Sequence, residues 1–413
     1  MTHLDSTASG DSPQAAKSGY GFLASIMDGI DAEELLDALQ QTRLTGRPGY
    51  PFRSMWRAWL AKYILSIRYN VDLVARLRSS ARLREVCGFD GPVPSESTFC
   101  RFFSRLADFQ HLVEQCLVAI TDQIGAKLPY FGKVVAADAS VFPTYGNPDR
   151  KTVQGNPCGD MDAKWGFKNS VRTKEKEEVE WCFGYKMHAI ADALYGIPLG
   201  FVLTPANTNE SPLLPEVVRK AQAAYKHLKP RFLLADRQYD SDNNFRFLNK
   251  RKITPVIHIR KPSNNRELHR GIYSPNGSPT CQGGKEMQYI STDPDTGHHL
   301  FRCPNGGCPL QTKRGVHYCA DEVWEDPAVE PRIVGTLPRA SPLWKKLYKR
   351  RWSVERVFRS LKHSRNLDQH CFRGMRKVLL HSTLSMLTYN ATVLARLDAG
   401  DRRNMRQMRV KES

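Results

Sequence analysis

The chain has 413 residues and a formal net charge of +19, from 61 lysines and arginines against 42 aspartates and glutamates. Its hydrophobic fraction of 41% is enough for two or three domains, and its charge indicates a polyanionic partner, with nucleic acid as the first candidate and a ribosome or a membrane surface as the alternatives. No apolar run reaches the roughly 20 residues of a membrane span and no signal-peptide core begins the chain, so we expect a cytoplasmic, nucleoid-associated protein with no membrane partner.

The N-terminal part of the chain predicts helices. Residues 1–30 are expected to form a disordered tail, because the chain begins with small and polar residues. Residues 31–128 predict an all-α domain, in which apolar side chains recur every three or four residues from Phe52 to Ile67. Its arginines fit a helix-turn-helix-like DNA-binding domain, and an ordinary helical bundle with a basic solvated face fits them equally well. These arginines are Arg76, Arg78, Arg82, Arg84, Arg101 and Arg105.

After residue 128 the hydrophobic pattern becomes that of strands. Residues 129–260 predict three strands, a helix, a strand, a helix and a strand, which is the order of an α/β domain. The first strand ends at Asp138 and the fourth ends at Asp236, and the ends of strands are where such sheets place their sites. The polar stretch from Thr144 to Val179 predicts an exposed loop or hairpin.

Four other polar residues near these strands are assigned structural roles. Asp192 ends a strand before a turn, and His188 lies within a strand. Asp240 and Asp242 precede a helical pattern, so we expect them to cap that helix.

Residues 261–338 break the pattern, since they are rich in Gly, Pro, Asn, Asp and Cys. A stretch of this length predicts a separate insertion, irregular or β-rich, within the α/β domain. Its four cysteines are candidate ligands of a structural Zn²⁺, and the alternative, which the loose Cys-x4-Cys spacing favours, is ordinary cysteines in a β-rich fold. The four are Cys281, Cys303, Cys308 and Cys319.

Residues 339–396 predict the second part of the α/β domain, and residues 397–413 a basic tail. On a helix from Trp344 to Arg365, at about 100° per residue, four polar side chains fall within about 60° of one another, between an apolar arc and a basic face. These four are Tyr348, Arg351, Glu355 and Lys362. This narrow strip of the helix surface contains a single carboxylate, and it is our candidate catalytic surface.

Three acidic residues from separate elements of a basic protein can bind the metal ions that act on nucleic-acid phosphates. Carboxylates are the ligands that Mg²⁺ and Mn²⁺ prefer, and two such ions about 3.5–4 Å apart catalyse phosphoryl transfer. Asp138, Asp236 and Glu355 are the candidate ligands, while Arg351 and Lys362 would hold DNA phosphates. The spacing alone leaves another interpretation open, in which the aspartates belong to turns and Glu355 forms a surface ion pair with Arg351.

The spacing Tyr348-x2-Arg351-x3-Glu355-x6-Lys362 fits, without a gap, the YREK signature of bacterial insertion-sequence DDE transposases. The stretch Gly184–Ser211 also looks like the pair of strands that precedes the second aspartate in these enzymes. The resemblance extends over most of the chain, from about residue 45 to about residue 395.

The resemblance implies a ribonuclease-H-like catalytic fold and a role for each matching residue. Asp138, Asp236 and Glu355 correspond to the three catalytic, metal-binding carboxylates. The residues that correspond to DNA-end-binding positions are Tyr348, Arg351 and Lys362. One departure concerns Gln238, which stands where the family often has a glycine before a tyrosine.

The expected function is therefore that of a DNA transposase that uses Mg²⁺ or Mn²⁺. It would bind both ends of its element as a homodimer, cleave phosphodiester bonds and join the free 3′ ends to target DNA. Two alternatives stay open on sequence grounds. One is a transposase-derived regulator that binds DNA without cleaving it, and the other is a nuclease that lacks the joining step.

Overall fold

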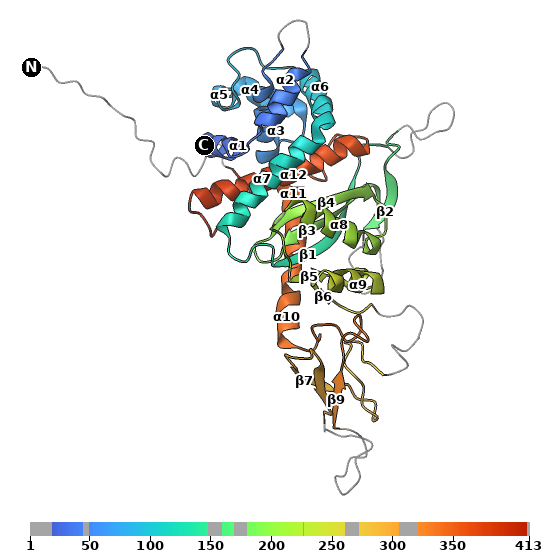
Figure 1. Cartoon of the computed structure of the whole chain (residues 1–413). Coiled ribbons are helices and arrows are strands. Elements are labelled where there is room, and N and C mark those ends of the chain that lie inside the picture. Colours follow the sequence, from blue (N-terminus) through green and yellow to red (C-terminus); the bar gives the residue numbers. More distant parts are fainter. Residues whose placement is uncertain are drawn as a thin grey trace, which may run out of the picture.

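The computed structural model describes residues 19–43, 49–147, 159–168, 180–225, 227–260, 272–304 and 321–410. Three parts follow one another along its long axis: a group of helices, a mixed sheet between helices, and a small three-stranded sheet (Figure 1). None of the helices in these ranges is long and apolar enough to cross a membrane.

The first part consists of helices that bury apolar faces against one another. They are α1 (Gly19–Asp28), α2 (Glu33–Gln41), α3 (Phe52–Ile64), α4 (Asn70–Ser79), α5 (Ala81–Cys87), α6 (Glu96–Leu106) and α7 (Gln110–Lys127). The expected tail of residues 1–30 is wrong in its second half, because α1 buries Phe22, Leu23 and Ile26 in the main core. These apolar residues at spacings of one, three and four are sufficient for a short amphipathic helix.

The central sheet contains both antiparallel and parallel strands. Its members are β1 (Val134–Pro143), β2 (Lys164–Lys168), β3 (Glu180–Asp192), β4 (Ile197–Pro205), β5 (Phe232–Ala235) and β6 (Thr254–Ile257). The strand order is β4-β3-β1-β5-β6, and β2 pairs with the first residues of β3 beyond the end of β4. The predicted sequence of strands and helices is confirmed, with β2 as an additional strand in the stretch expected to be a loop or hairpin. The expectation that the first strand ends at Asp138 is wrong, because β1 stays paired with β3 as far as Pro143. This mixed sheet fits a ribonuclease-H-like α/β fold.

Helices cover both faces of the sheet, because alternate residues of each strand point to opposite faces. One face packs on α8 (Leu214–Ala224) and α9 (Asp242–Lys250) through residues such as Val135 and Ala137. The other face packs on α11 (Trp352–Arg365) and α12 (Met375–Asp398) through residues such as Ala136 and Phe142. The sheet edge that carries the carboxylates is thereby fixed between two cores.

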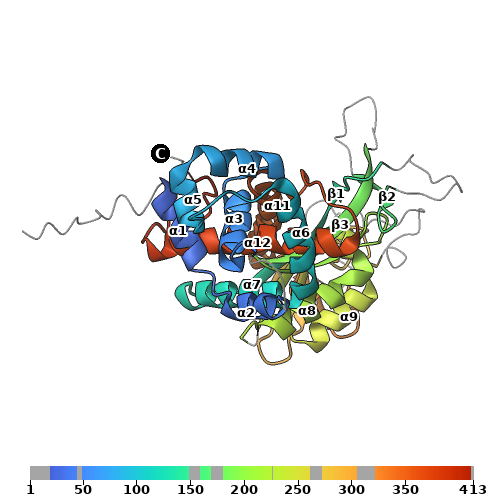
Figure 2. The same cartoon turned by 90° about the horizontal axis from the view of Figure 1, so that it is seen from above.

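The helix α12 joins the sheet to the N-terminal helices. It is buried along most of its length and lies beneath α3 and beside α7 when the molecule is seen from above (Figure 2). Tyr63 of α3 forms a 2.7 Å hydrogen bond with Nδ1 of His381, and Asn390 donates a 2.8 Å hydrogen bond to Thr121 of α7. The N-terminal helices therefore share one continuous core with the sheet, and the domain boundary at residue 128 stays a prediction.

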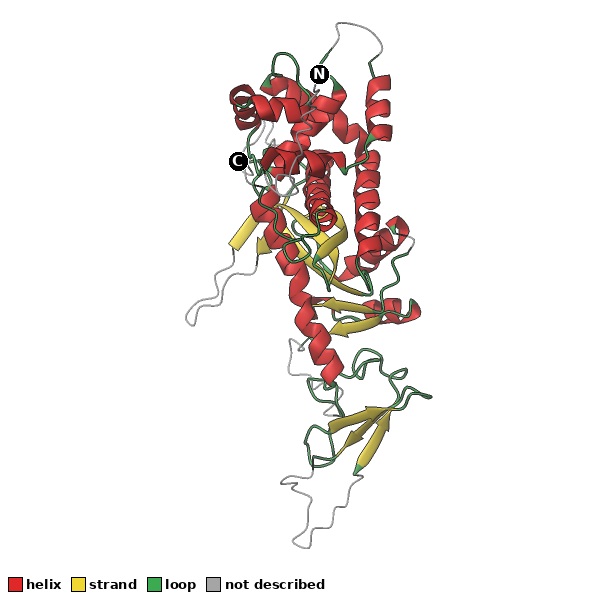
Figure 3. Cartoon of the chain, turned by 90° about the vertical axis from the view of Figure 1, so that its left-hand side faces the viewer, coloured by secondary structure: helices red, strands yellow, loops and turns green. Residues whose placement is uncertain are grey.

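The segment from Trp344 to Arg365 is not one regular helix. It comprises α10 (Pro342–Tyr348), a 3₁₀ turn at Lys349–Arg351 and α11. Figure 3 shows the three pieces as one long helical run beside the sheet. The tighter turn changes the angular relation between the residues before and after it, so the even 100° spacing assumed for the four polar residues does not hold across it.

The insertion contains a second sheet of three antiparallel strands, β7 (Gln288–Thr292), β8 (His299–Arg302) and β9 (Glu322–Glu325), at the far end of the molecule (Figure 1). Cys281 packs with Met287 and Phe301 in a small apolar cluster, and Cys303 is buried. Cys308 and Cys319 lie outside the described residues. The structural Zn²⁺ site therefore stays a prediction.

Candidate active site

Two of the predicted carboxylates lie on neighbouring strands. Strands β1 and β5 run parallel, and Ala136 is opposite Leu234. Two residues further along each strand direction come Asp138 and Asp236, which places both carboxylates at the same level of the sheet. Since neighbouring strands lie about 4.8 Å apart, the two side chains start from positions that two ligands of one ion, or of two adjacent ions, require.

Local hydrogen bonds orient both aspartates. Oδ1 of Asp236 accepts a 2.8 Å hydrogen bond from the backbone N–H of Gln238, at the start of the 3₁₀ turn Arg237–Tyr239. Oδ1 of Asp138 accepts a 2.9 Å hydrogen bond from the N–H of Ala139. Gln238 is not among the residues with positive φ, so this turn does not require the glycine that the family often has there.

Burial raises the pKa of both carboxylates. The pKa of Asp138 is raised to about 7, mainly by desolvation and also by the charges of Asp236 and Glu210, against the lowering effects of a backbone hydrogen bond and Arg351. The pKa of Asp236 is also raised, mainly by burial. Two partly buried carboxylates on neighbouring strands therefore favour a cation between them.

Arg351 links Glu355, the third predicted carboxylate, to the strands that carry the two aspartates. Its guanidinium forms a 2.6 Å ion pair with Glu355, and its charge lowers the pKa of both Asp138 and Asp236. The 3₁₀ turn that carries Arg351 contacts β1 and β5, so the ion pair with Glu355 lies near the strands that carry Asp138 and Asp236. The ion pair between residues four apart, which was the alternative interpretation, is thus present within the site itself.

The oxygen donors of this group suit Mg²⁺ or Mn²⁺, which prefer carboxylate ligands. Asp138 and Asp236 fit such an ion by their adjacent positions and by the raised pKa of each. The carboxylate of Glu355 is bound to Arg351 instead. Within the described part of the chain, no three His, Cys, Asp or Glu side chains are close enough to hold one ion.

Tyr348 lies at the edge of a surface cavity of about 500 Å³ beside these residues. Its ring stacks on Trp344, with centroids 4.7 Å apart, and meets the ring of His258 edge-on at 4.3 Å. The cavity is lined by Asp236, Arg237, His258, Ile259, Pro275, Asn276, Tyr348 and Arg351. An acidic residue, two arginines and aromatic rings thus border one hollow that can accept a phosphodiester.

Lys362 is not among the residues that line the cavity. Its Nζ donates a 2.9 Å hydrogen bond to the backbone carbonyl of Val141, three residues beyond Asp138 on β1. Five of the six predicted site residues therefore gather around Arg351 and the cavity, whereas Lys362 contacts the strand next to them.

Sequence reasoning missed Glu210, which follows β4 and whose charge raises the pKa of Asp138. Glu210 forms a 3.2 Å ion pair with Lys186, and Lys186 also donates a 3.0 Å hydrogen bond to the carbonyl of Thr208. The only available signal was a carboxylate soon after a strand, in the polar run Asn207–Ser211. The prediction that His188 is structural agrees with its 2.9 Å hydrogen bond to Thr204.

Comparisons with known proteins show the family to which the chain belongs. The family model described as "Transposase DDE domain" matches residues 129–391, and a second model described as a transposase domain matches residues 12–105. A Burkholderia cepacia protein described as a transposase for insertion sequence element IS402 is 40% identical over 83 residues, which are 19% of this chain and 39% of that protein. The chain thus spans well under two thirds of the length of that relative.

The structure is also similar to a cryo-EM structure of a piggyBac transposase synaptic complex with hairpin DNA. The similarity covers 95% of this chain and 79% of that chain, at 14% sequence identity and a TM-score of 0.38. A TM-score this low supports no argument about the site. The match of the "Transposase DDE domain" model is sufficient by itself, because it extends over more than half of the residues. The chain belongs to the transposase DDE domain family.

Proposed function

We propose that this chain is a DNA transposase that cleaves phosphodiester bonds at the ends of its own element and joins the free 3′ ends to target DNA. The observation that supports the proposal is the adjacent placement of Asp138 and Asp236 beside Arg351, which is ion-paired with Glu355, next to a cavity lined by basic and aromatic residues. The net charge of +19 favours a DNA partner over a small phosphate ester.

Asp138 and Asp236 would hold Mg²⁺ or Mn²⁺, and Glu355 would be the third ligand once its carboxylate exchanges Arg351 for the ion. Such ions supply activation of the attacking oxygen and neutralisation of charge on the leaving oxygen in phosphoryl transfer. The strand positions of Asp138 and Asp236 fix two of the three ligands before substrate arrives. Preformed ligands lower the cost of organising the site when DNA binds.

The cations of the site would bind the DNA backbone. Arg351 has its guanidinium at the cavity, and a guanidinium can form two parallel hydrogen bonds with one phosphate. Arg237 adds a second positive charge to the same wall. Tyr348 presents a ring supported by Trp344 and His258, which suits stacking on a base or a hydrogen bond to a phosphate oxygen. Lys362 would bind a phosphate further along the DNA strand.

The working form would be a homodimer, because two element ends have to be held together during joining. The N-terminal helices, with their exposed arginines, would supply the sequence-specific contacts to these ends. A protein of this kind acts where DNA is accessible, which in a bacterium is the nucleoid.

The test is a cleavage and joining assay with Mg²⁺ on a duplex that carries the element's own ends. Asp138→Ala, Asp236→Ala and Glu355→Ala are each expected to abolish cleavage while binding of the duplex persists. Full cleavage by any one of them would remove that residue from the site. Pre-cut ends distinguish the alternatives: a nuclease would cleave without joining these ends, and a regulator would bind them without either reaction.

A further inference from the structure

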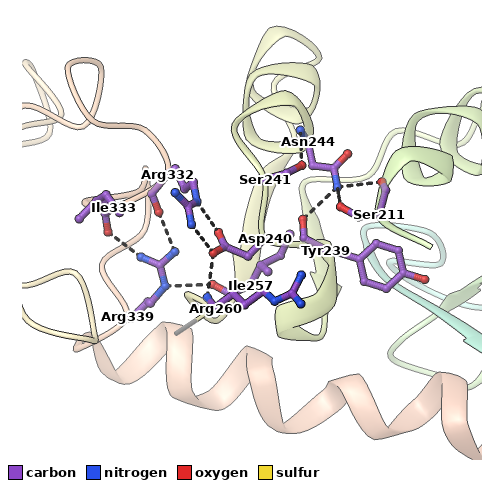
Figure 4. Close-up of polar contacts among 10 residues, drawn as sticks. All are labelled: Ser211, Tyr239, Asp240, Ser241, Asn244, Ile257, Arg260, Arg332, Ile333 and Arg339. Atoms are coloured by element: carbon purple, nitrogen blue, oxygen red, sulfur yellow. Dashed lines mark hydrogen bonds and ion pairs between the residues drawn. The ribbon is translucent and has the colours of Figure 1, made fainter. Parts of the chain in front are cut away.

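Asp240 lies at the end of the turn that begins at Asp236, and its side chain is fully buried. Arg332 of the insertion binds it with two parallel hydrogen bonds, from Nε to Oδ1 at 2.9 Å and from Nη2 to Oδ2 at 2.8 Å. The backbone N–H of Arg260 adds a third, at 2.8 Å (Figure 4). The expectation that Asp240 caps the next helix is wrong, because Ser241 accepts the capping hydrogen bond of α9.

A second cation, which is buried, attaches the insertion to the sheet next to Arg332. Arg339 donates hydrogen bonds to the carbonyl oxygens of Arg332 at 2.8 Å and Ile333 at 2.6 Å, both within the insertion. It donates a third, at 2.9 Å, to the carbonyl of Ile257, the last residue of β6 (Figure 4). Since β6 lies beside β5, both arginines attach the insertion to the strand ends next to Asp236.

The same turn is held from its other side by Asn244 of α9. Its Nδ2 group donates to the carbonyl of Tyr239 at 2.9 Å and to both the carbonyl and the hydroxyl of Ser211 at 3.0 Å. Ser211 follows Glu210 in the chain, and Asn244 is almost completely buried. The turn that carries Asp236 thus lies between an amide on one side and the insertion on the other (Figure 4).

The insertion also reaches the cavity itself. Pro275 and Asn276 belong to the insertion and line the same hollow as Asp236 and Tyr348. The place of the insertion relative to the turn therefore sets one wall of the cavity as well as the surroundings of Asp236.

We propose that the Asp240–Arg332 ion pair positions Asp236 and holds the Pro275–Asn276 wall beside the cavity, so that the insertion is part of the working site. Neither partner touches the reacting atoms, and both are positioning residues. A buried, two-bond ion pair is directional, and a carboxylate ligand must be held within about 0.5 Å of its working place. The proposal rests on the proposed function for its metal and activity readouts, whereas the exchange readout below does not depend on it.

The test compares the full-length protein with two variants at this pair and a matched control. Arg332→Gln removes one partner and leaves a buried carboxylate, so it can also destabilise the fold. Asp240→Asn combined with Arg332→Met removes both charges, keeps an acceptor for Arg260 and avoids an unpaired buried charge. The control is Arg302→Gln, which breaks a 2.6 Å ion pair with Glu322 in the same insertion, where both side chains are about half exposed.

Hydrogen exchange of the Gln238 amide, measured without metal, reports the turn directly, because this N–H is bonded to Asp236. We expect exchange of this amide to be about 10-fold faster in the double variant, as expected when the support of a ligand is lost. Affinity for Mn²⁺ alone, measured by electron paramagnetic resonance, should fall about 10-fold or more. The control should match the wild type in both measurements.

Cleavage of the element-end duplex completes the test. The double variant should need about 10-fold more Mg²⁺ for half-maximal cleavage, with duplex binding unchanged. Wild-type exchange and wild-type Mn²⁺ affinity in the double variant would overturn the positioning role. An inactive wild type, or a fully active Asp236→Ala variant, would instead refute the proposed function. The exchange measurement would still decide whether the ion pair holds the turn.

Discussion

The central sheet is joined to its two neighbours in different ways. The N-terminal helices meet it through one continuous apolar core, in which Trp59 and Phe103 contact Phe372, just before α12, at centroid distances of 6.3 and 4.1 Å. The insertion meets it through the hydrogen bonds of two cations, the partly exposed Arg332 and the buried Arg339. Apolar burial is strong but non-directional, whereas charged hydrogen bonds fix distance and angle. The directional junction is the one that lies beside Asp236.

The apolar junction should be the most sensitive to lost volume. Trp59→Ala is expected to lower the free energy of unfolding by about 3–5 kcal/mol, because Trp59 is completely buried among Phe99, Phe103 and Tyr63. Chemical denaturation measures the loss. Trp165→Ala is the control, since Trp165 is half exposed, and an equal loss in both variants would contradict the comparison.

Loss of the polar junction should open the insertion without unfolding the rest of the chain. Arg339→Met is expected to cost about 2–4 kcal/mol, because it leaves three buried carbonyl groups without their donor. Limited proteolysis should then cut the insertion before the helices and the sheet. A single cooperative unfolding transition, with simultaneous loss of all three parts, would show that the junction is not separate from the main core.

Acid should weaken the apolar junction through its buried histidines. Burial lowers the pKa of His370 from 6.5 to about 4. The unfolded chain therefore binds more protons between these values, so stability is complete above about pH 6.5 and falls as the pH drops toward 4. This group contributes up to about 3 kcal/mol. Denaturation between pH 4 and 7 measures the slope, and His370→Gln should flatten it; an unchanged slope would exclude His370 as its source.

A polar contact within the apolar junction should have a smaller effect. Tyr63→Phe removes the hydroxyl that bonds His381 at 2.7 Å, and we expect a loss of about 1–2 kcal/mol. The change in melting temperature gives this value. A loss comparable to that of Trp59→Ala would mean that hydrogen bonds, and not apolar burial, dominate this junction.

The smallest effect is expected at the surface of the insertion. Arg302→Gln breaks an exposed ion pair, so its cost should stay below about 1 kcal/mol. Differential scanning calorimetry of this variant and of Arg339→Met separates surface from buried charge. A larger loss in Arg302→Gln would contradict the distinction between the two kinds of ion pair.

The two aspartates were identified because each follows an apolar run, but only Asp236 follows the end of its strand, since β1 continues past Asp138 to Pro143. Glu355 was predictable by spacing, but its 2.6 Å bond to Arg351 was expected only as an alternative to a site. Glu210 and Asp240 were not identified as parts of the site or its support. Their partners, Lys186 and Arg332, lie 24 and 92 residues away, and no local pattern encodes a contact across such separations.

Local chemistry accounts for what could be inferred from the residues alone. Alternation and helical periodicity act over a few positions, so they reveal the order of strands and helices, the carboxylates that follow apolar runs and the acidic residue on α11. The joining of α10 and α11 by a 3₁₀ turn and the gathering of charges around Arg351 depend on contacts between distant segments. So does the attachment of the insertion beside Asp236. Packing and the burial of charge select these contacts, and they exist only once the chain has folded.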